Sequence, residues 1–291
     1  MQPDILLTLS AGSVRPLLAA QDPRCPTIFA VPQFVATDLE LRGLNLPADM
    51  LKGFGYTEIE RLRDEADRAH CPVLLLSEEN PIDFTQRTGP GWHQTLDRLR
   101  RLATAANRLG CPSIAVRASA PATDEAFEST AAGVKIVLKE IDKFELNLLL
   151  APIEGLTFDA ARLTDLIKKI GGFRIGSYPS FAHAYATGEL EKTLRKLAPY
   201  APAIAASVRG FDKAGAHDGY SLAECIESVQ SVGYGNTLAL DFVGRDDEKK
   251  KGGKKAAPVD IVAELDMARR QLAELTAEPD EIAQGADDDE E

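Results

Sequence analysis

The chain has 291 residues, of which 44% are hydrophobic and 27% charged, the composition of an ordinary soluble globular protein. No run approaches the roughly 18 apolar residues of a membrane-spanning helix, and the N-terminal residues lack the basic and apolar regions of a secretion signal. These features predict a cytoplasmic protein with no membrane partner.

The net charge of −12 is unevenly distributed along the chain. Residues 278–291 hold eight acidic and no basic side chains, so residues 1–277 carry only −4. A mildly acidic body argues against a nucleic-acid partner, which requires a basic face. The acidic tail has little to bury, so we expect disorder there and one domain over residues 1–277.

Four cysteines, Cys25, Cys71, Cys111 and Cys225, show neither a C-x-x-C pair nor a Cys/His cluster with zinc spacing. Cys71 and Cys111 directly precede apolar runs, where a small buried hydrophobic side chain fits. We therefore predict four buried, reduced thiols.

Eight short apolar runs mark the predicted strands. They cover residues 5–9, 39–44, 73–76, 113–116, 146–150, 173–176, 203–208 and 238–242. Segments with helical spacing alternate with most of them, at residues 57–69, 91–109, 123–144, 157–170, 188–200, 221–232 and 259–276. Strands that alternate with helices indicate βαβ units and a parallel sheet, and eight such units predict a single (β/α)8 TIM barrel, an α/β fold.

A near-repeat supports this organisation. The sequence ADRAHCP at 66–72 recurs as ANRLGCP at 106–112, 40 residues later. In both copies an amphipathic segment ends, Cys-Pro follows and an apolar run begins. The spacing of 40 residues between the copies is the length expected of one βα unit. By contrast, residues 245–255 (RDDEKKKGGKK) interrupt the pattern, and we interpret the basic stretch 249–255 as a solvated loop rather than a phosphate site.

In a TIM barrel the chemistry lies at the C-terminal ends of the strands. The neighbouring Glu78 and Glu79 point to opposite faces of a strand, so at most one of them faces the barrel axis. We expect Arg42 and Arg117 to end two strands and to point into the mouth. There they either bind an anionic group or pair with Glu78 or Glu79.

The sequences LRGLN at 41–45, ADRAHCP at 66–72 and GYGNTLALDF at 233–242 resemble the xylose isomerase-like TIM-barrel superfamily, in its sugar phosphate isomerase/epimerase branch. The resemblance spans residues 35–245. It implies a site in which one divalent metal (Mn²⁺, Mg²⁺, Co²⁺ or Zn²⁺) is held by Glu, Asp, His and Glu after strands five to eight. The metal polarises the sugar oxygens, and the two Glu ligands move protons between neighbouring carbons.

This chain departs from that ligand set. The strand-five Glu falls at about Pro152, with Glu154 two residues further on, and the D-x-x-H motif after strand six reads SFAH, from Ser180 to His183. The strand-seven His aligns near Ser207, with Arg209 where a Lys often stands. The strand-eight Glu is Asp241. The resemblance therefore implies a degenerate metal site that binds a metal weakly or not at all, with Glu154, His183 and Asp241 as weak candidate ligands.

Two functions remain open at this stage. In the first, the protein is an isomerase or epimerase of a small sugar or polyol. Glu154 and Asp241 are then the catalytic bases, and the substrate contacts are Arg42, Arg117, Ser180, His183, Ser207 and Arg209. In the second, it is a pseudoenzyme that binds a polyol or a protein partner.

Structural roles compete with these assignments. Asp241 is equally explained by pairing with Arg209 across the mouth. His183 begins a predicted helix and could satisfy a backbone group, and His217 lies in a glycine-containing loop that favours a surface position. The oligomeric state and the identity of the substrate are not indicated by the sequence.

Overall fold

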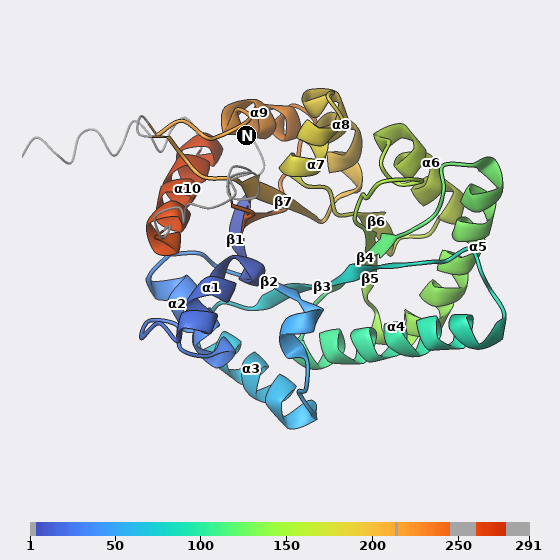
Figure 1. Cartoon of the computed structure of the whole chain (residues 1–291), viewed down its shortest axis with the longest axis horizontal. Helices are drawn as coiled ribbons and strands as arrows, with labels where there is room; N and C mark the ends of the chain where they lie inside the picture. The colour runs from blue at the N-terminus through green and yellow to red at the C-terminus, as the bar shows by residue number, and fades with distance from the viewer. Residues whose placement is uncertain (1–3, 213–214, 245–259, 278–291) are drawn as a thin grey trace, which may run out of the picture.

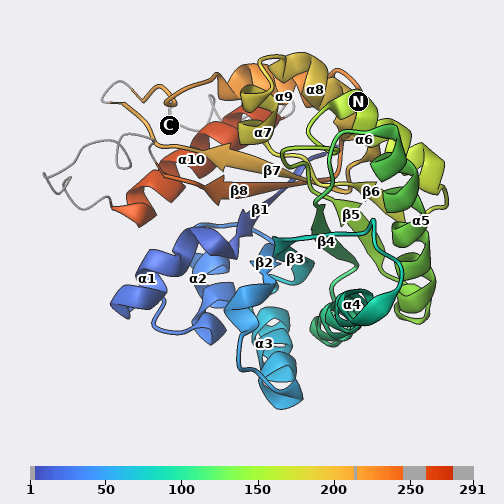
Figure 2. The same ribbon diagram turned by 45° about the vertical axis from the view of Figure 1, so that its right-hand side comes forward.

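A computed structural model describes residues 4–212, 215–244 and 260–277 of the chain. In these residues eight parallel strands form one curled sheet, in the order β6-β5-β4-β3-β2-β1-β8-β7, with the helices outside it (Figures 1 and 2). The strands are β1 (Leu6–Ser10), β2 (Leu44–Pro47), β3 (Val73–Ile82), β4 (Ser113–Ala118), β5 (Asn147–Leu150), β6 (Ile175–Ser177), β7 (Ala203–Val208) and β8 (Thr237–Phe242). The predicted (β/α)8 TIM barrel is confirmed.

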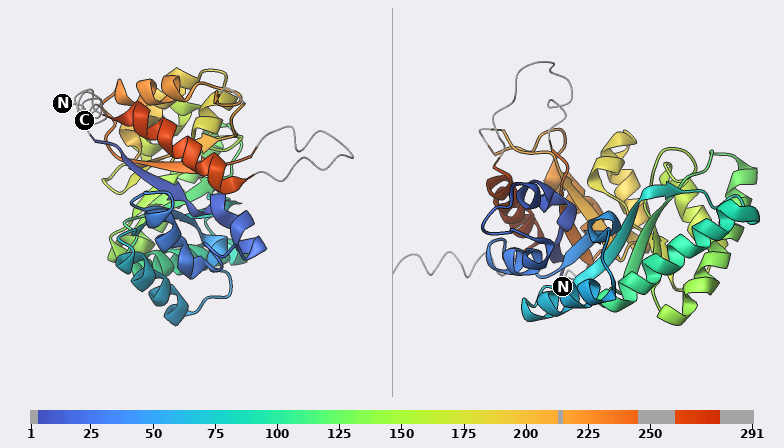
Figure 3. Two further views of the ribbon diagram at one scale, coloured as in Figure 1. Left: turned by 90° about the vertical axis from the view of Figure 1, so that its left-hand side faces the viewer. Right: turned by 60° about the horizontal axis from the view of Figure 1, so that its bottom comes forward.

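The helices return the chain from the C-terminal to the N-terminal end of the strands. They are α1 (Arg15–Ala20), α2 (Val31–Thr37), α3 (Tyr56–Arg68), α4 (Gly89–Leu109), α5 (Asp124–Ile141), α6 (Ala160–Ile170), α7 (Phe181–Ala186), α8 (Leu190–Leu197), α9 (Leu222–Gln230) and α10 (Ile261–Thr276). The long ones match the predicted helices to within a few residues. The short helices α1 and α2 carry too few turns for their spacing to show in the sequence. Figure 3 shows α10 on the outer side of the barrel, where it packs against β8 and α9.

The strand register decides which side chains face the axis of the barrel. Ser113 pairs with both Leu75 and Asn147, and Leu149 pairs with Gly176. Alternate residues along each strand share a face, so the inner face of this wall is fixed by these pairs. Leu75, Ala115, Leu149 and Ala203 form a separate buried cluster inside the barrel. This cluster is the apolar floor on which the mouth of the barrel rests.

The junction of β6 and β7 closes the barrel with very few hydrogen bonds. In the part of the chain that the structure describes, these two strands share no ladder, and a single backbone bridge joins Ser180 to Ala205. The Ala205 amide donates to the Pro179 carbonyl oxygen at 2.9 Å. We call this junction, residues 179, 180 and 205, the β6–β7 seam.

Two predicted strands are displaced. The second apolar run, 39–44, precedes the strand: Leu39 and Leu41 are buried, but Glu40 has φ +51°, which breaks the extension, and β2 begins only at Leu44. In the sixth run Phe173 is fully exposed and lies before β6. In both places apolar residues precede the paired segment, so the run alone misplaces its start.

The two copies of the repeat form the same helix ending. The Cys71 amide donates to the Ala66 carbonyl oxygen at 2.9 Å, and the Cys111 amide donates to Ala106 at the same distance. The residue before each cysteine, His70 or Gly110, adopts a positive φ, as in a common helix C-terminal motif. The prediction of repeated βα units is confirmed here, as is the burial of all four free cysteines.

The predicted loop 245–255 and the predicted disordered tail 278–291 lie outside the described residues. Within those that are described, no helix has the length and apolar character needed to span a membrane.

Candidate functional site

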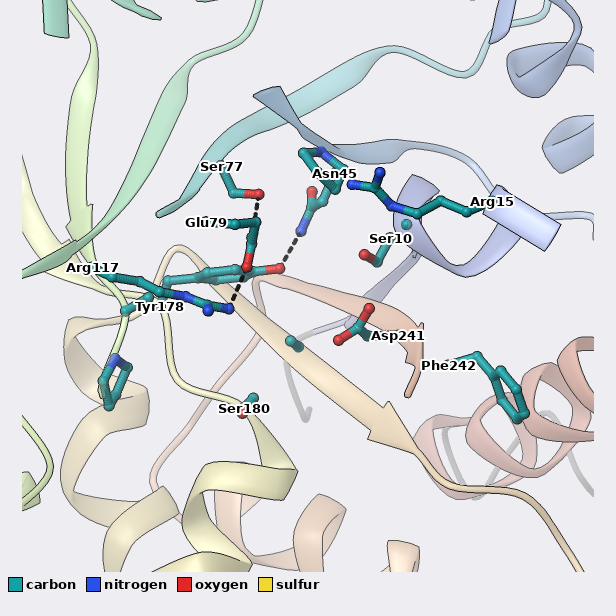
Figure 4. A pocket seen from close by; sticks show the side chains of 15 residues that line it. Ser10, Arg15, Asn45, Ser77, Glu79, Arg117, Tyr178, Ser180, Asp241 and Phe242 are labelled. Atoms are coloured by element: carbon teal, nitrogen blue, oxygen red, sulfur yellow. Dashed lines mark hydrogen bonds and ion pairs between the residues drawn. The ribbon is translucent and has the colours of Figure 1, made fainter. Parts of the chain in front are cut away.

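A cavity of about 290 Å³ opens at the C-terminal ends of the strands (Figure 4). This volume is near the lower end of the roughly 300–1,000 Å³ typical of small-molecule sites. Every strand, or the residues directly after it, contributes to the wall. The lining residues are Ser10, Gly12, Arg15, Asn45, Pro47, Ser77, Glu79, Arg117, Ala151, Pro152, Tyr178, Ser180, Ala205, Asp241 and Phe242. We refer to this cavity as the mouth.

Asp241 is a carboxylate in an unfavourable place for charge. It extends from β8 into the mouth and accepts a hydrogen bond from the Ser10 side chain. Burial raises the pKa of Asp241, and the nearby Glu79 adds to this, whereas Ser10 and Arg117 act in the opposite direction. A carboxyl group with a raised pKa in a cavity is a reasonable proton-transfer group.

Glu79 extends into the same cavity from β3. Its Oε1 accepts a hydrogen bond from the Ser77 hydroxyl at 2.8 Å, and its Oε2 forms an ion pair with Arg117 of β4. The adjacent Glu78 faces the other way and pairs with Arg98 of α4 at 2.8 Å. The expectation that at most one of the two carboxylates faces the axis is confirmed, as is the pairing of Arg117 with one of them.

Asn45 and Tyr178 face each other across the mouth. The Asn45 Nδ2 donates to the Tyr178 hydroxyl oxygen at 3.2 Å. The ring of Tyr178 packs on the apolar floor. Burial, followed by the charge of Asp241, raises the pKa of Tyr178, so its hydroxyl keeps its proton.

Arg15, from α1, adds a second guanidinium group to the wall. Its Nη2 pairs with Asp49 at 2.6 Å, outside the set of lining residues. The mouth thus combines two guanidinium groups and two carboxylates with several hydroxyl groups and one amide.

Three of the predicted site residues lie together in the mouth: Asp241, Arg117 and Ser180. Ser180 also has a structural role, because its hydroxyl accepts the His183 amide at the start of α7 at 3.1 Å. The hydrogen-bond partner of Asp241 is Ser10, and no ion pair joins Asp241 to Arg209 within the described residues.

Two predicted residues lie away from the mouth. Arg42 precedes β2 and is exposed at the opposite end of the barrel, so the expectation that it points into the mouth is wrong. Its placement followed from the displaced second strand. Glu154 is an exposed loop residue outside the cavity wall.

The remaining three predicted residues surround the mouth without lining it. Ser207 is buried on β7 beside Asp241, and its carbonyl oxygen accepts the Tyr220 hydroxyl. The guanidinium of Arg209 lies 5.4 Å from the centre of the Tyr185 ring, over its face. His183 Nε2 bonds the Phe158 carbonyl oxygen at 2.9 Å, and burial lowers the pKa of this histidine.

His217, expected at the surface, is half-buried. Its Nε2 accepts the Arg209 amide at 2.9 Å, and its Nδ1 bonds the Tyr220 carbonyl oxygen at the same distance. The ring organises the loop after β7, and burial lowers its pKa.

The donors of the mouth do not fit the divalent metal of the resembled family. Among the described residues, Glu79 and Asp241 are the only acidic side chains that line the mouth, and no His or Cys lines it. Both oxygens of Glu79 are already engaged. Across the described ranges, no group of three or more His, Cys, Asp or Glu is arranged to hold a metal ion. Tight sites for such ions use three or more protein ligands of these types.

The predicted site residues did not include Ser10, Arg15, Asn45, Ser77 and Tyr178 of the wall, and Glu79 was considered only as one of a pair. Ser10, Asn45, Glu79 and Tyr178 were visible as polar residues at strand ends. Their shared inward parity could have selected them once the strand register was known. Arg15 comes from a helix that the sequence pattern does not reveal.

Comparison with known proteins identifies the architecture. No family model and no curated protein sequence matches the chain. A solved structure of L-ribulose 3-epimerase superposes with a TM-score of 0.71 and 15% identity, covering 100% of this chain and 99% of that one. A xylose isomerase domain protein from Planctomyces limnophilus gives 0.64 and 15%, covering 94% and 96%. The chain has the xylose isomerase-like TIM-barrel fold.

Another structure with this fold is the IOLI protein, solved with zinc. It superposes with a TM-score of 0.69 and 8% identity, covering 94% of this chain and 98% of that one. At these identities the likeness concerns the fold, so the chemistry must be argued from the mouth itself.

Proposed function

We propose that the mouth binds a small sugar or polyol and that the protein is an isomerase- or epimerase-type barrel. The observation that carries this proposal is the wall of the cavity, in which hydroxyl, amide, carboxylate and guanidinium groups converge from successive strands on about 290 Å³. A polyol carries closely spaced hydroxyl groups that each donate and accept, and such a wall can pair with them. The fold, shared with L-ribulose 3-epimerase, supports the same substrate class.

The proposed chemistry is proton transfer beside a carbonyl group. Asp241 takes the proton from carbon, since its raised pKa brings it closer to neutral pH than an ordinary carboxylate. Glu79, held by Ser77 and Arg117 on another part of the wall, accepts a hydroxyl proton, or serves the opposite face of the sugar, through its remaining lone pairs. Arg117 supplies positive charge near both carboxylates. This scheme uses no metal ion, and we propose that the family ligands have been lost.

A second candidate function is a non-catalytic barrel that binds a polyol or a protein partner. This function is supported by the residues at the strand ends where the resembled family has its metal ligands. There the wall of the mouth consists of Ala151, Pro152, Ser180 and Ala205, and Ser207 lies behind this wall. These residues cannot move protons from carbon at neutral pH. Binding without turnover would follow if Asp241 acts only as a hydrogen-bond acceptor.

Thermal unfolding in the presence of L-ribulose, D-fructose, ribitol and myo-inositol tests the binding site. We expect at least one of them to raise the melting temperature of the wild type, and Asp241→Asn to abolish that rise. Asp165→Asn is the matched control, because Asp165 is an exposed carboxylate on α6, remote from the mouth. A ligand-induced rise that survives Asp241→Asn would place the site elsewhere.

Incubation of the ketoses in D₂O separates the two functions. An isomerase or epimerase incorporates deuterium at the carbon beside the carbonyl group, and a binding protein does not. Calorimetric titration with Mn²⁺ on the same sample tests the loss of the metal site. Stoichiometric, tight Mn²⁺ binding would contradict that part of the proposal.

A further inference from the structure

Tyr178 has the position of a functional group at the bottom of the mouth. It follows β6 directly, and its ring rests on the buried cluster of Leu75, Ala115, Leu149 and Ala203. Figure 4 shows its hydroxyl group directed into the space between Glu79 and Asp241. The packing of the ring against this cluster places the hydroxyl inside the cavity.

The hydrogen-bond pattern leaves the phenolic hydrogen available. Asn45 Nδ2 donates to the Tyr178 oxygen at 3.2 Å, so this oxygen is the acceptor in that hydrogen bond. Within the described residues, the Tyr178 hydroxyl donates a hydrogen bond to no protein group. Asn45 itself is only 2% exposed and is held in β2 between β1 and β3. A buried amide therefore orients a hydroxyl whose proton still lacks an acceptor.

Several other donor groups of the wall are held by acidic side chains. Arg117 is paired with Glu79, and Arg15 is paired with Asp49. The Ser77 hydroxyl donates to Glu79, and the Ser10 side chain bonds Asp241. Tyr178 thus offers a donor that no acidic side chain holds and that can meet a ligand oxygen without breaking an existing interaction.

We infer that the Tyr178 hydroxyl is a catalytic group that donates a hydrogen bond to the carbonyl oxygen of the substrate while Asp241 removes a proton from the adjacent carbon. This inference rests on the proposed isomerase- or epimerase-type function. It assigns to a phenol the polarisation of the carbonyl group, and it makes Asn45 a positioning residue that orients the phenol.

The step balances without a cofactor. The Asp241 carboxylate forms an O–H bond with the proton, and the C–H electron pair becomes the C=C bond of an enolate. The π electron pair of the carbonyl group moves to its oxygen, where the Tyr178 O–H stabilises the negative charge. Return of a proton from Asp241 restores the carbonyl group and the carboxylate. Because the protonated Asp241 exchanges with solvent, the returned proton is deuterium in D₂O.

Burial keeps Tyr178 suited to this role. Its pKa is raised mainly by desolvation and further by the charge of Asp241, so it keeps its proton and acts as a hydrogen-bond donor at neutral pH. Donors that are oriented before the reaction stabilise developing charge most effectively.

The test is deuterium incorporation into L-ribulose and D-fructose, followed by proton NMR for the wild type, Tyr178→Phe and Tyr56→Phe. The last is the matched control, because Tyr56 is exposed on α3 and its ring lies under Arg108. We expect Tyr178→Phe to lower the turnover number for exchange about 100- to 1,000-fold, the usual effect of removing one such donor, with little change in KM. Tyr56→Phe should match the wild type.

Asn45→Asp provides a second, independent variant. A carboxylate at this position removes the N–H donor and accepts the phenolic hydrogen itself, so the hydroxyl is withdrawn from the substrate. We expect a fall in turnover similar to that of Tyr178→Phe, with the ring and its hydroxyl still present. Should Tyr178→Phe fail to fold, judged by circular dichroism and urea unfolding, Asn45→Asp decides the question.

The outcomes separate this inference from the proposed function. Exchange by the wild type that stays within threefold in both variants would overturn the role of Tyr178 and leave the isomerase-type function standing. Sugar binding without any exchange by the wild type would remove the proposed reaction and the role of Tyr178 together, in favour of a binding barrel.

Discussion

Replacing Leu149 by alanine tests whether the mouth stands on a packed floor. Leu149 is fully buried inside the barrel, as a member of the cluster beneath Tyr178. Buried Leu→Ala changes cost about 3–5 kcal/mol, the larger values arising where the surroundings cannot collapse into the space. Strands enclose Leu149 on its inner face and hold their spacing by ladder hydrogen bonds, so we expect about 4 kcal/mol.

Urea unfolding, followed by circular dichroism, measures this loss as a fall in the midpoint at an unchanged slope. Leu6→Ala on β1 is the matched control, because it is the same substitution at a side chain that is 42% exposed. We expect it to lower the free energy of unfolding by about 1 kcal/mol. In a chain of this size each kcal/mol shifts the melting temperature by about 2–4 °C, so the two variants are readily distinguished. Equal losses for both, or a loss below about 1.5 kcal/mol for Leu149→Ala, would refute a close-packed interior.

Three further predictions follow from individual contacts. Burial raises the pKa of Asp241, so Asp241→Asn should stabilise the free protein at neutral pH. This gain in stability should vanish as the pH falls through the folded-state pKa, because the wild-type carboxyl group then takes up its proton. A gain that is independent of pH in urea unfolding would contradict this. A Cβ at Gly133 of α5 would lie 2.2 Å from the backbone oxygen of Phe84. Gly133→Ala should therefore lower the free energy of unfolding by about 1–3 kcal/mol, in spite of alanine's better helix propensity. An increase in the urea midpoint of unfolding would be inconsistent with this close packing. Burial raises the pKa of the Cys111 thiol to about 12, so iodoacetamide at mildly alkaline pH should label this thiol only after unfolding in urea. Peptide mass spectrometry measures the labelling. Prompt labelling of the folded protein would be inconsistent with the burial of Cys111.

The architecture was accessible from the sequence because strand burial and helix periodicity are local signals. The eight apolar runs and the repeated helix endings predict the barrel, and six of the runs overlap their strands closely. The second run failed for a local reason as well: a positive φ at Glu40 separates buried leucines from the strand that follows them. An apolar run indicates that its residues are buried, and here the buried residues Leu39 and Leu41 precede the start of β2 at Leu44.

The composition of the mouth was less accessible because it depends on register. One residue of displacement in a strand reverses which side chains face the axis. The shift of β2 therefore moved Arg42 away from the mouth and brought Asn45 into its wall. Glu79 and Tyr178 are inward residues at strand ends. Their selection required the pairing of neighbouring strands, which no single segment of sequence encodes.

The β6–β7 seam has a consequence for motion. Ser180 forms part of the wall of the mouth and part of this junction, where one backbone bridge replaces a ladder. Breathing of a folded protein begins where the fewest hydrogen bonds must break, so amide protons around residue 205 are expected to exchange with solvent earlier than those of the other strands. A ligand that contacts both Ser180 and Ala205 would hold the two sides of the seam together. Slower amide exchange at the seam would then report ligand binding even when no reaction takes place.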